Sequence, residues 1–319
     1  MSESLLSVRN LKTYFFTYKG VVKAVDDVSF EIGQGESLGI VGETGCGKSV
    51  TASSIIRLLS PTARVMGGEI LFEGEDMLTK NMNEIKKIRG NEISMIFQDP
   101  MTSLDPVFKC GDQLAEVIEH HQNLGRDGTK KKMLEMLKHV RIPDPESRAR
   151  NYPHELSGGM RQRIMIAIAL ACQPKLLIAD EPTTALDVTV QAQILQLMDN
   201  LRREMGTSII MITHNLGVVA EMCEKVAVMY CGNIVEYANI KSLFHNHRHP
   251  YTEALLGALP VRGKSRLESV AGDVPNPINP PEGCKFHPRC KHAMDICSKK
   301  RPPTISIEKD HTVACYLVN

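Results

Sequence analysis

The 319-residue sequence contains no tryptophan, and aromatic residues make up only 5% of it. So few aromatic side chains leave no stacking platform for the bases of a nucleic acid. The formal net charge is +1, without the basic excess typical of nucleic-acid-binding domains. No apolar run approaches the roughly 20 residues that a membrane-spanning helix needs. The opening stretch, MSESLLSVRN, lacks the basic and then apolar layout of a signal peptide. We therefore expect a soluble protein of the cytoplasm.

Apolar segments separated by helical patterns dominate the rest of the chain. Hydrophobic residues account for 42% and charged residues for 24% of the sequence, as in ordinary globular proteins. The alternation predicts an α/β fold with a parallel sheet covered on both faces. The predicted core strands are residues 37–41, 93–97, 176–179 and 208–213.

Other segments predict additions to this core. Weak alternation over 7–32 predicts antiparallel strands, and 106–168 predicts a mostly helical insertion. We also expect a helix over 49–59 and a hairpin over 226–237, around Cys231-Gly232-Asn233.

The composition changes after about Pro260. The segment VPNPINPPEG holds four of the 17 prolines, which excludes a regular helix or strand there. We therefore predict one large domain over 1–260, with its helical part at about 99–168, and a small C-terminal extension over 261–319.

A glycine-rich loop follows the first predicted core strand. Its sequence, GETGCGKS, fits the P-loop pattern G-x-x-x-x-G-K-[ST]. Glycines let successive backbone amides surround the phosphates of ATP, and the following helix presents its positive end to them. Lys48 would contact the β- and γ-phosphates, and the Ser49 hydroxyl would bind Mg²⁺. A chance glycine turn is the alternative, which the flanking strand and helix disfavour. The predicted nucleotide contacts are Gly42, Glu43, Thr44, Gly45, Cys46, Gly47, Lys48, Ser49 and Val50.

The strand Leu176–Ala179 ends in two carboxylates, Asp180 and Glu181. This is the Walker B arrangement, in which Asp180 holds Mg²⁺ and Glu181 polarises the attacking water. A strand that merely ends in a solvated acidic turn is the alternative, and the upstream P-loop argues against it.

The segment Leu156-Ser157-Gly158-Gly159-Met160 resembles the LSGGQ signature of the ATP-binding-cassette (ABC) family. Ser157, Gly158 and Gly159 at a helix start form a second phosphate-binding end. The resemblance implies that this end closes over the γ-phosphate held by the P-loop of a second ATPase subunit. Met160 replaces the common glutamine. We expect function to survive, because backbone amides and Ser157 make most of the contacts.

The same resemblance implies roles for four more residues. Gln98 matches the glutamine that senses the γ-phosphate or Mg²⁺, and Asp187 matches the aspartate of the loop at the dimer seam. His214 matches the histidine that holds the attacking water together with the Walker B glutamate. Phe15 matches the aromatic residue that stacks on adenine, although its neighbours Tyr14 and Phe16 could serve instead. The implied catalytic set is Glu181, His214, Gln98 and Lys48, and the implied magnesium set is Ser49, Gln98 and Asp180.

Two further stretches narrow the resemblance. QDPMTSLDP, beginning at Gln98, and HPYT, beginning at His249, are similar to the ATPase subunits of dipeptide, oligopeptide and nickel importers, above all the dipeptide D type. The implied fold is a RecA-like P-loop NTPase core with an antiparallel β subdomain and a helical signature subdomain.

The implied partners are a homologous ATPase subunit, in a heterodimer or homodimer, two membrane permeases and an extracellular solute-binding protein. The implied location is the cytoplasmic face of the membrane. Nickel or another solute in place of peptides stays open. A soluble ABC ATPase acting on nucleic acid or ribosomes is disfavoured by the single cassette and the neutral charge.

Four of the nine cysteines lie near the C-terminus: Cys284, Cys290, Cys297 and Cys315. Four thiolates suit zinc or an iron–sulfur cluster, and disulfides are rare in a reducing cytoplasm. The absence of a close C-x₂₋₄-C pair favours a [4Fe–4S] cluster over zinc, and similar tails in the dipeptide-importer subfamily carry such clusters. Zinc and free thiols stay open as alternatives, and His287 is expected to be a surface residue.

Overall fold

The computed structural model describes residues 4–98, 103–184, 186–259, 270 and 272–318. The chain divides into two compact units, which are described separately. The first unit comprises Met1–Gly33, Ser37–Thr79 and Met211–Asn319, and the second comprises Gln34–Glu36 and Lys80–Ile210. In the described ranges, no helix is long and apolar enough to cross a membrane.

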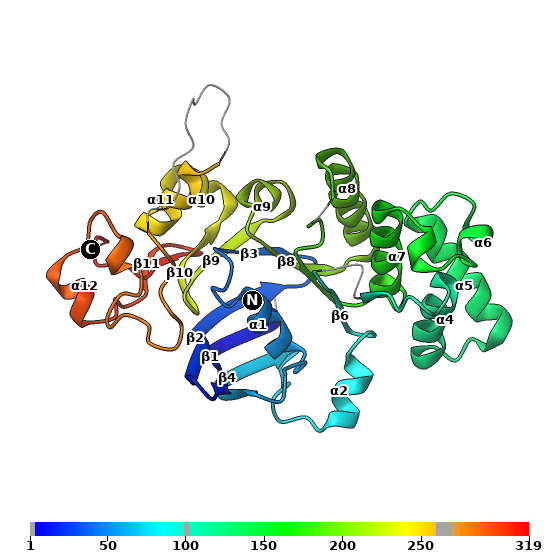
Figure 1. Cartoon of the computed structure of the whole chain (residues 1–319), viewed down its shortest axis with the longest axis horizontal. Coiled ribbons are helices and arrows are strands. Elements are labelled where there is room, and N and C mark those ends of the chain that lie inside the picture. Colours follow the sequence, from blue (N-terminus) through cyan, green and yellow to red (C-terminus); the bar gives the residue numbers. More distant parts are fainter. Residues whose placement is uncertain (1–3, 99–102, 185, 260–269, 271, 319) are drawn as a thin grey trace. The chain divides into compact units, whose positions relative to one another are not determined.

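An antiparallel sheet in the strand order β2-β1-β4-β5 begins the first unit (Figure 1). Leu6 of β1 lies opposite Ile32 of β2 and Phe72 of β4, and all three side chains are buried. The antiparallel strands predicted over 7–32 are confirmed. The strands are β1 (Ser4–Thr17), β2 (Gly20–Gly33), β4 (Ala63–Phe72) and β5 (Glu75–Asp76).

The first unit also contains a parallel pair of buried strands. β3 (Ser37–Val41) is buried along its whole length and pairs in parallel with β9 (Lys225–Tyr230). β9 forms the predicted hairpin with β10 (Asn233–Asn239). Cys231 and Gly232, between the two strands, have φ values of 43° and 81°. Two successive positive φ values match the twist of a two-residue hairpin turn.

The helix after the P-loop, α1 (Lys48–Ile55), is shorter than the predicted 49–59. Arg57 has φ 54°, in the left-handed region, and its amide donates to Ser54 O instead of continuing the helical ladder. Helices commonly end at such a residue. The sequence pattern did not reveal this stop, because its apolar residues run on to Leu59.

The C-terminal residues 272–318 belong to the same unit as β3 and the P-loop. They form two short strands that sequence analysis did not predict, β11 (Ile305–Glu308) and β12 (His311–Val313). β12 pairs with β10, so the end of the chain extends the sheet that contains β3 and β9 (Figure 1). The proline-rich stretch 274–283 contains no regular element, as predicted. The predicted boundary at 260 lies outside the described residues.

The remaining elements of the first unit are all helical. They are α9 (Leu216–Met222), α10 (Ile240–Asn246), α11 (Pro250–Gly257), α12 (Asp295–Lys299) and the 3₁₀ turn η2 (His287–Arg289).

In the second unit, β6 (Ile93–Ile96) and β7 (Leu176–Asp180) pair in parallel. The stretch predicted to be helical contains helices, of which α4 (Cys110–His121), α5 (Gly125–His139) and α7 (Gly158–Leu170) pack on one another. β8 (Ser208–Thr213) begins in this unit and ends in the first. The other elements are α2 (Met82–Ile88), α6 (Pro145–Arg148), η1 (Pro153–Glu155) and α8 (Val188–Met205).

Candidate functional site

The P-loop joins β3 to α1, and its backbone requires glycine. Gly42, Gly45 and Gly47 have φ values of 155°, 81° and 107°, which other residues rarely adopt. A side chain at Gly42 would also collide with the carbonyl of Met229, and one at Gly47 with that of Ala24. The backbone therefore turns tightly here, and the first residues of α1 face the loop. This local structure is the one that P-loop chemistry needs.

Lys48 lies inside this loop. Its side chain is buried, and Nζ donates to the carbonyl oxygens of Gly42 at 2.7 Å and Glu43 at 3.2 Å. Ser49, the second residue of α1, is exposed. Carbonyl dipoles hold the ammonium in the concave side of the loop, and a phosphate there would form a stronger, charge-assisted bond with it.

The Walker B residues lie in the second unit. Asp180 is the buried last residue of β7. Glu181 has φ 45°, and such a left-handed conformation in a residue other than glycine is typical of functional sites. Its Oε2 accepts from Gln98 Nε2 at 3.2 Å and from Thr184 Oγ1 at 2.9 Å. The structure thus brings together two of the predicted residues, Gln98 and Glu181, and adds Thr184. Sequence analysis did not single out this threonine, although it lies only three residues after Glu181.

Two more predicted residues of the second unit begin helices. Ser157 caps α7, and its Oγ accepts from the Met160 amide at 3.3 Å. Asp187 caps α8, and its Oδ1 accepts from the Val190 amide at 2.9 Å. Both side chains are typical helix caps, and Gly158 and Gly159 form the first turn of α7, as predicted. Asp99 to Thr102 of the QDPMTSLDP stretch lie outside the described residues.

His214 follows β8 and is exposed, in the first unit. The next residue, Asn215, caps α9 by accepting from the Gly217 amide at 2.9 Å. The backbone therefore turns directly after His214. The role of this histidine in holding water stays a prediction.

The three aromatic candidates for adenine stacking lie next to one another in β1. Tyr14 donates its hydroxyl to Asp26 at 2.8 Å, and burial together with this carboxylate raises the pKa of Tyr14 to about 12. The guanidinium of Arg64 lies 6.0 Å from the ring centre of Phe16. Phe15 lies opposite Val22 and Ala63 and is half-buried. Because both alternatives have other interactions, Phe15 stays the preferred prediction.

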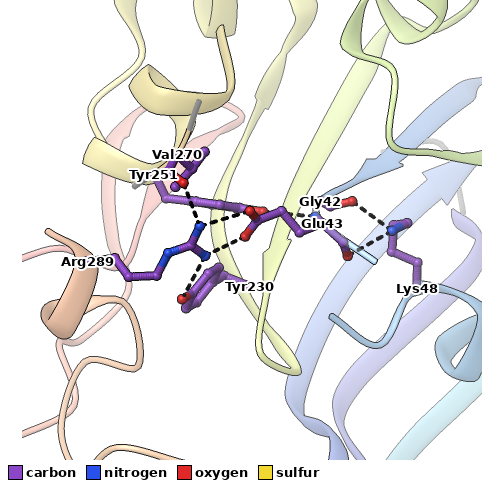
Figure 2. Close-up of polar contacts among 7 residues, drawn as sticks. All are labelled: Gly42, Glu43, Lys48, Tyr230, Tyr251, Val270 and Arg289. Atoms are coloured by element: carbon purple, nitrogen blue, oxygen red, sulfur yellow. Dashed lines mark hydrogen bonds and ion pairs between the residues drawn. The ribbon is translucent and has the colours of Figure 1, made fainter. Parts of the chain in front are cut away.

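Sequence analysis missed the contacts that the C-terminal residues make with the P-loop (Figure 2). Arg289 forms a two-pronged ion pair with the Glu43 carboxylate. The Tyr251 hydroxyl accepts from the Glu43 amide at 2.9 Å. Tyr251 belongs to the HPYT stretch, which was noticed, but nothing in the sequence relates it to a residue 208 positions earlier.

The four C-terminal cysteines line one small cavity. Burial, followed by the charges of the other three cysteines, raises the pKa of the Cys284 thiol to about 11, while the Phe286 amide opposes the rise. Burial also raises the pKa of the Cys290 and Cys315 thiols, and the backbone amides of His292 and Leu317 oppose the rise. All nine cysteines are described and none forms a disulfide. Among the described residues, however, no group of three or more His, Cys, Asp or Glu side chains is arranged so that it could hold a metal ion.

Two family models match the sequence. The ABC transporter model matches residues 25–184. The model of the oligopeptide/dipeptide transporter C-terminal region matches residues 235–297. The second match contains Tyr251 and Arg289, the residues that contact the P-loop.

Curated relatives match over the whole chain. A probable peptide ABC transporter ATP-binding protein, y4tR, of Sinorhizobium fredii is 52% identical and covers 100% of this chain and 96% of the relative. The oligopeptide transport ATP-binding protein AppD of Bacillus subtilis is 50% identical over 98% of this chain and 97% of its own length. The dipeptide transport ATP-binding protein DppD of the same organism is 49% identical over 99% and 95%.

Solved structures agree with this relationship. The ATP-binding cassette MJ0796, in a dimeric post-hydrolysis state bound to ADP and Pi, has a TM-score of 0.67 and 26% identity. The match covers 74% of this chain and 98% of that one. These matches confirm the predicted P-loop NTPase α/β fold. Together with the P-loop, the Walker B strand and the signature helix, they show that this chain belongs to the ATP-binding proteins of ABC transporters, in the group with the oligopeptide/dipeptide transporter C-terminal region.

Proposed function

We propose that this chain binds and hydrolyses ATP to power the uptake of dipeptides or oligopeptides through partner permeases. The observation that carries the proposal is the glycine-bent loop around buried Lys48, in a chain that also has the C-terminal region of peptide transporters. The match to two relatives named for peptide transport covers 96% and 97% of their length. Nickel or another solute is the alternative.

Each predicted catalytic residue has a distinct task in this proposal. Lys48 and the loop amides bind the phosphates, and Glu181 accepts a proton from the attacking water. His214 orients that water, and Gln98 holds the Glu181 carboxylate in place. The exposed Ser49 hydroxyl and the carboxylate of Asp180 are hard oxygen donors that suit Mg²⁺, with Gln98 as a third. When bound there, Mg²⁺ would neutralise phosphate charge.

We further propose that the working ATPase is a pair of homologous subunits, and that the usual pair is a heterodimer. At the start of α7, Ser157 is exposed and Gly158 is half-buried, so that this helix end offers backbone amides to a second nucleotide. Val188, directly after Asp187, is an apolar residue that is 84% exposed, as expected at a subunit seam. Two matching solved structures, both of the cassette MJ0796, are dimeric.

The chain contributes no membrane-spanning helix in its described residues. From the family resemblance we propose that it lies at the cytoplasmic face of the membrane, where two permeases would hold it. An extracellular solute-binding protein would supply the peptide to them. This arrangement follows from the family and from the peptide relatives.

Uptake of radiolabelled dipeptide by cells that carry the whole transporter tests the proposal. Lys48→Ala is expected to abolish uptake, because the P-loop loses the positive charge that it offers to the phosphates. The exposed Lys19→Ala serves as the matched control and is expected to transport normally. Undiminished uptake in Lys48→Ala would contradict the role of the P-loop. Lys48-dependent uptake of nickel but not of peptides would instead favour the alternative solute.

For the C-terminal cysteines we propose a [4Fe–4S] cluster held in a small cysteine-rich module, as the sequence analysis favoured. Support comes from the shared cavity and from the amides directed at three sulfurs, since such amides stabilise thiolates. Anaerobic purification with a visible spectrum and counts of iron, sulfide and zinc tests it. We expect about four irons per chain, lost in Cys284→Ser and kept in the distant Cys172→Ser. One zinc, or no metal, would refute the cluster.

A further inference from the structure

The acidic residue of the P-loop, Glu43, is engaged through both its side chain and its backbone. Arg289 Nη1 and Nη2 donate to the two carboxylate oxygens at 2.6 Å and 3.0 Å. The Arg289 side chain is 4% exposed and that of Glu43 is 26% exposed. Water therefore screens this pair only in part, and its planar geometry is the strong form of an arginine–carboxylate contact.

Arg289 is itself held in place by two neighbours besides Glu43 (Figure 2). Its guanidinium donates to the Tyr230 hydroxyl at 3.3 Å and to the Val270 carbonyl at 3.2 Å. It also lies 5.8 Å from the centre of the Tyr230 ring. A guanidinium with so many fixed partners is a rigid anchor rather than a mobile surface charge.

A second anchor holds the Glu43 backbone. The Tyr251 side chain is fully buried, and its ring contacts Tyr230 and Phe286 at centroid distances of 4.6 Å and 5.3 Å. Its hydroxyl accepts from the Glu43 amide. The carbonyl of Glu43 in turn accepts from Lys48 Nζ. A continuous chain of polar contacts therefore runs from the C-terminal segment through Glu43 to the lysine of the nucleotide loop.

We propose that Arg289 is a positioning residue for ATP binding: it fixes and neutralises Glu43, and thereby makes the affinity of the P-loop for ATP depend on the cysteine-bearing C-terminal segment. This inference rests on the proposed role of the P-loop as the ATP site. Arg289 does not touch the nucleotide in this scheme and acts only through Glu43.

Charge is the physical reason. ATP brings several negative charges to the loop, and an uncompensated carboxylate at position 43 would repel them. The bidentate guanidinium cancels this charge within contact distance, where little water intervenes to screen it. It also prevents the carboxylate from turning toward Lys48 and competing with phosphate for the ammonium.

The position of Arg289 in the sequence links this effect to the cysteines. It directly precedes Cys290, and the next lysine toward the N-terminus, Lys285, directly follows Cys284 and binds the Cys231 carbonyl at 2.9 Å. Arg289 thus attaches this segment to the P-loop directly, and Lys285 attaches it to the β9–β10 turn, whose Gly232 amide donates to the Cys46 carbonyl of the P-loop at 2.8 Å. A change in the cysteine segment that displaced Arg289 would therefore alter the affinity of the P-loop for ATP.

Equilibrium binding of Mg-ATP and of adenosine to the purified full-length chain tests the inference. Arg289→Met is expected to weaken ATP binding about tenfold, equivalent to about 1.4 kcal/mol, and to leave adenosine binding unchanged, because adenosine carries no phosphate. Arg289→Lys keeps the charge without the two-pronged geometry and is expected to lie in between. The matched control is Arg301→Met, which removes another C-terminal arginine, paired with Asp27 at 3.2 Å.

The decisive variant is Glu43→Gln combined with Arg289→Met. If charge compensation is the mechanism, the double variant, which carries neither charge, binds ATP within about twofold of the unaltered protein. A purely structural role would leave the Arg289→Met defect undiminished in the double variant, and would weaken adenosine binding as well. ATP affinity of Arg289→Met within twofold of the unaltered protein would also overturn the inference. Failure of the unaltered chain to bind ATP, or full binding by Lys48→Ala, would refute the ATP site itself.

Discussion

Replacing Glu181 with glutamine tests the proposed chemistry most directly. The side chain keeps its size, and its carbonyl oxygen can still accept from Gln98 and Thr184, the two partners that hold the carboxylate at 3.2 Å and 2.9 Å. Glutamine also tolerates the φ of 45° at this position about as well as glutamate. What the variant lacks is an atom that can take a proton from water.

The size of the effect follows from this single loss. A positioned general base contributes about 10²- to 10⁴-fold to a rate, so we expect ATP turnover to fall at least a hundredfold, or by about 2.7 kcal/mol in the barrier. The P-loop amides and Lys48 are untouched. ATP affinity is therefore expected to stay within about threefold of the unaltered protein, a small change on the scale where tenfold is 1.4 kcal/mol.

Two measurements on the same preparations separate these effects: phosphate release with Mg-ATP, in the purified chain and in the reconstituted transporter, and equilibrium nucleotide binding. Glu204→Gln is the matched control, since Glu204 is an exposed residue of α8, and it should hydrolyse normally. Turnover of Glu181→Gln within threefold of the unaltered protein, with intact binding, would show that another group removes the proton.

Three further outcomes concern stability. Glu236→Gln should lower the free energy of unfolding by about 3 kcal/mol, measured with urea, because its buried carboxylate accepts from the Arg248 and His249 amides and from His311. Burial lowers the pKa of His249 to about 3, so only the unfolded chain gains its proton below about pH 6.5. Stability should fall by up to about 1.4 kcal/mol per pH unit between pH 6.5 and 3, with a shallower slope in His249→Asn. Asp187→Ala should cost about 1 kcal/mol by removing the α8 cap, whereas Asp187→Asn should cost little; equal melting temperatures would contradict this.

The parts of the site that sequence analysis predicted are those set by neighbouring residues. The P-loop is fixed by glycines within a few positions of Lys48, and the structure shows why each backbone bend excludes other residues. The hairpin at Cys231-Gly232 and the strand before Asp180 are local in the same sense. Such patterns can be interpreted because strand, turn and helix each follow from a short window of sequence.

The parts that were missed depend on contacts between distant residues. Arg289 and Glu43 are separated by 246 positions, and neither residue type is unusual where it stands. β12 is only three residues long and gains its ladder by pairing with β10, so its stability comes from tertiary context rather than from its own propensity. The end of α1 was misplaced for a related reason, since the left-handed Arg57 leaves no signal in an apolar pattern.

Met160 stands where glutamine is common in the signature, and the cap of α7 supports the prediction that function survives this replacement. The Met160 amide is already bound to the Ser157 hydroxyl oxygen as part of the α7 cap, so the amides that remain for a phosphate at this helix end are those of Gly158 and Gly159. A serine hydroxyl accepts one hydrogen bond and still donates another. Ser157 can therefore cap α7 and bind a phosphate oxygen at the same time. These three donors, two backbone amides and one serine hydroxyl, do not depend on the side chain at position 160. Methionine lacks the side-chain amide that glutamine would offer to the nucleotide, so we expect closure over the nucleotide to be weaker, while the helix end that attracts the phosphate is kept.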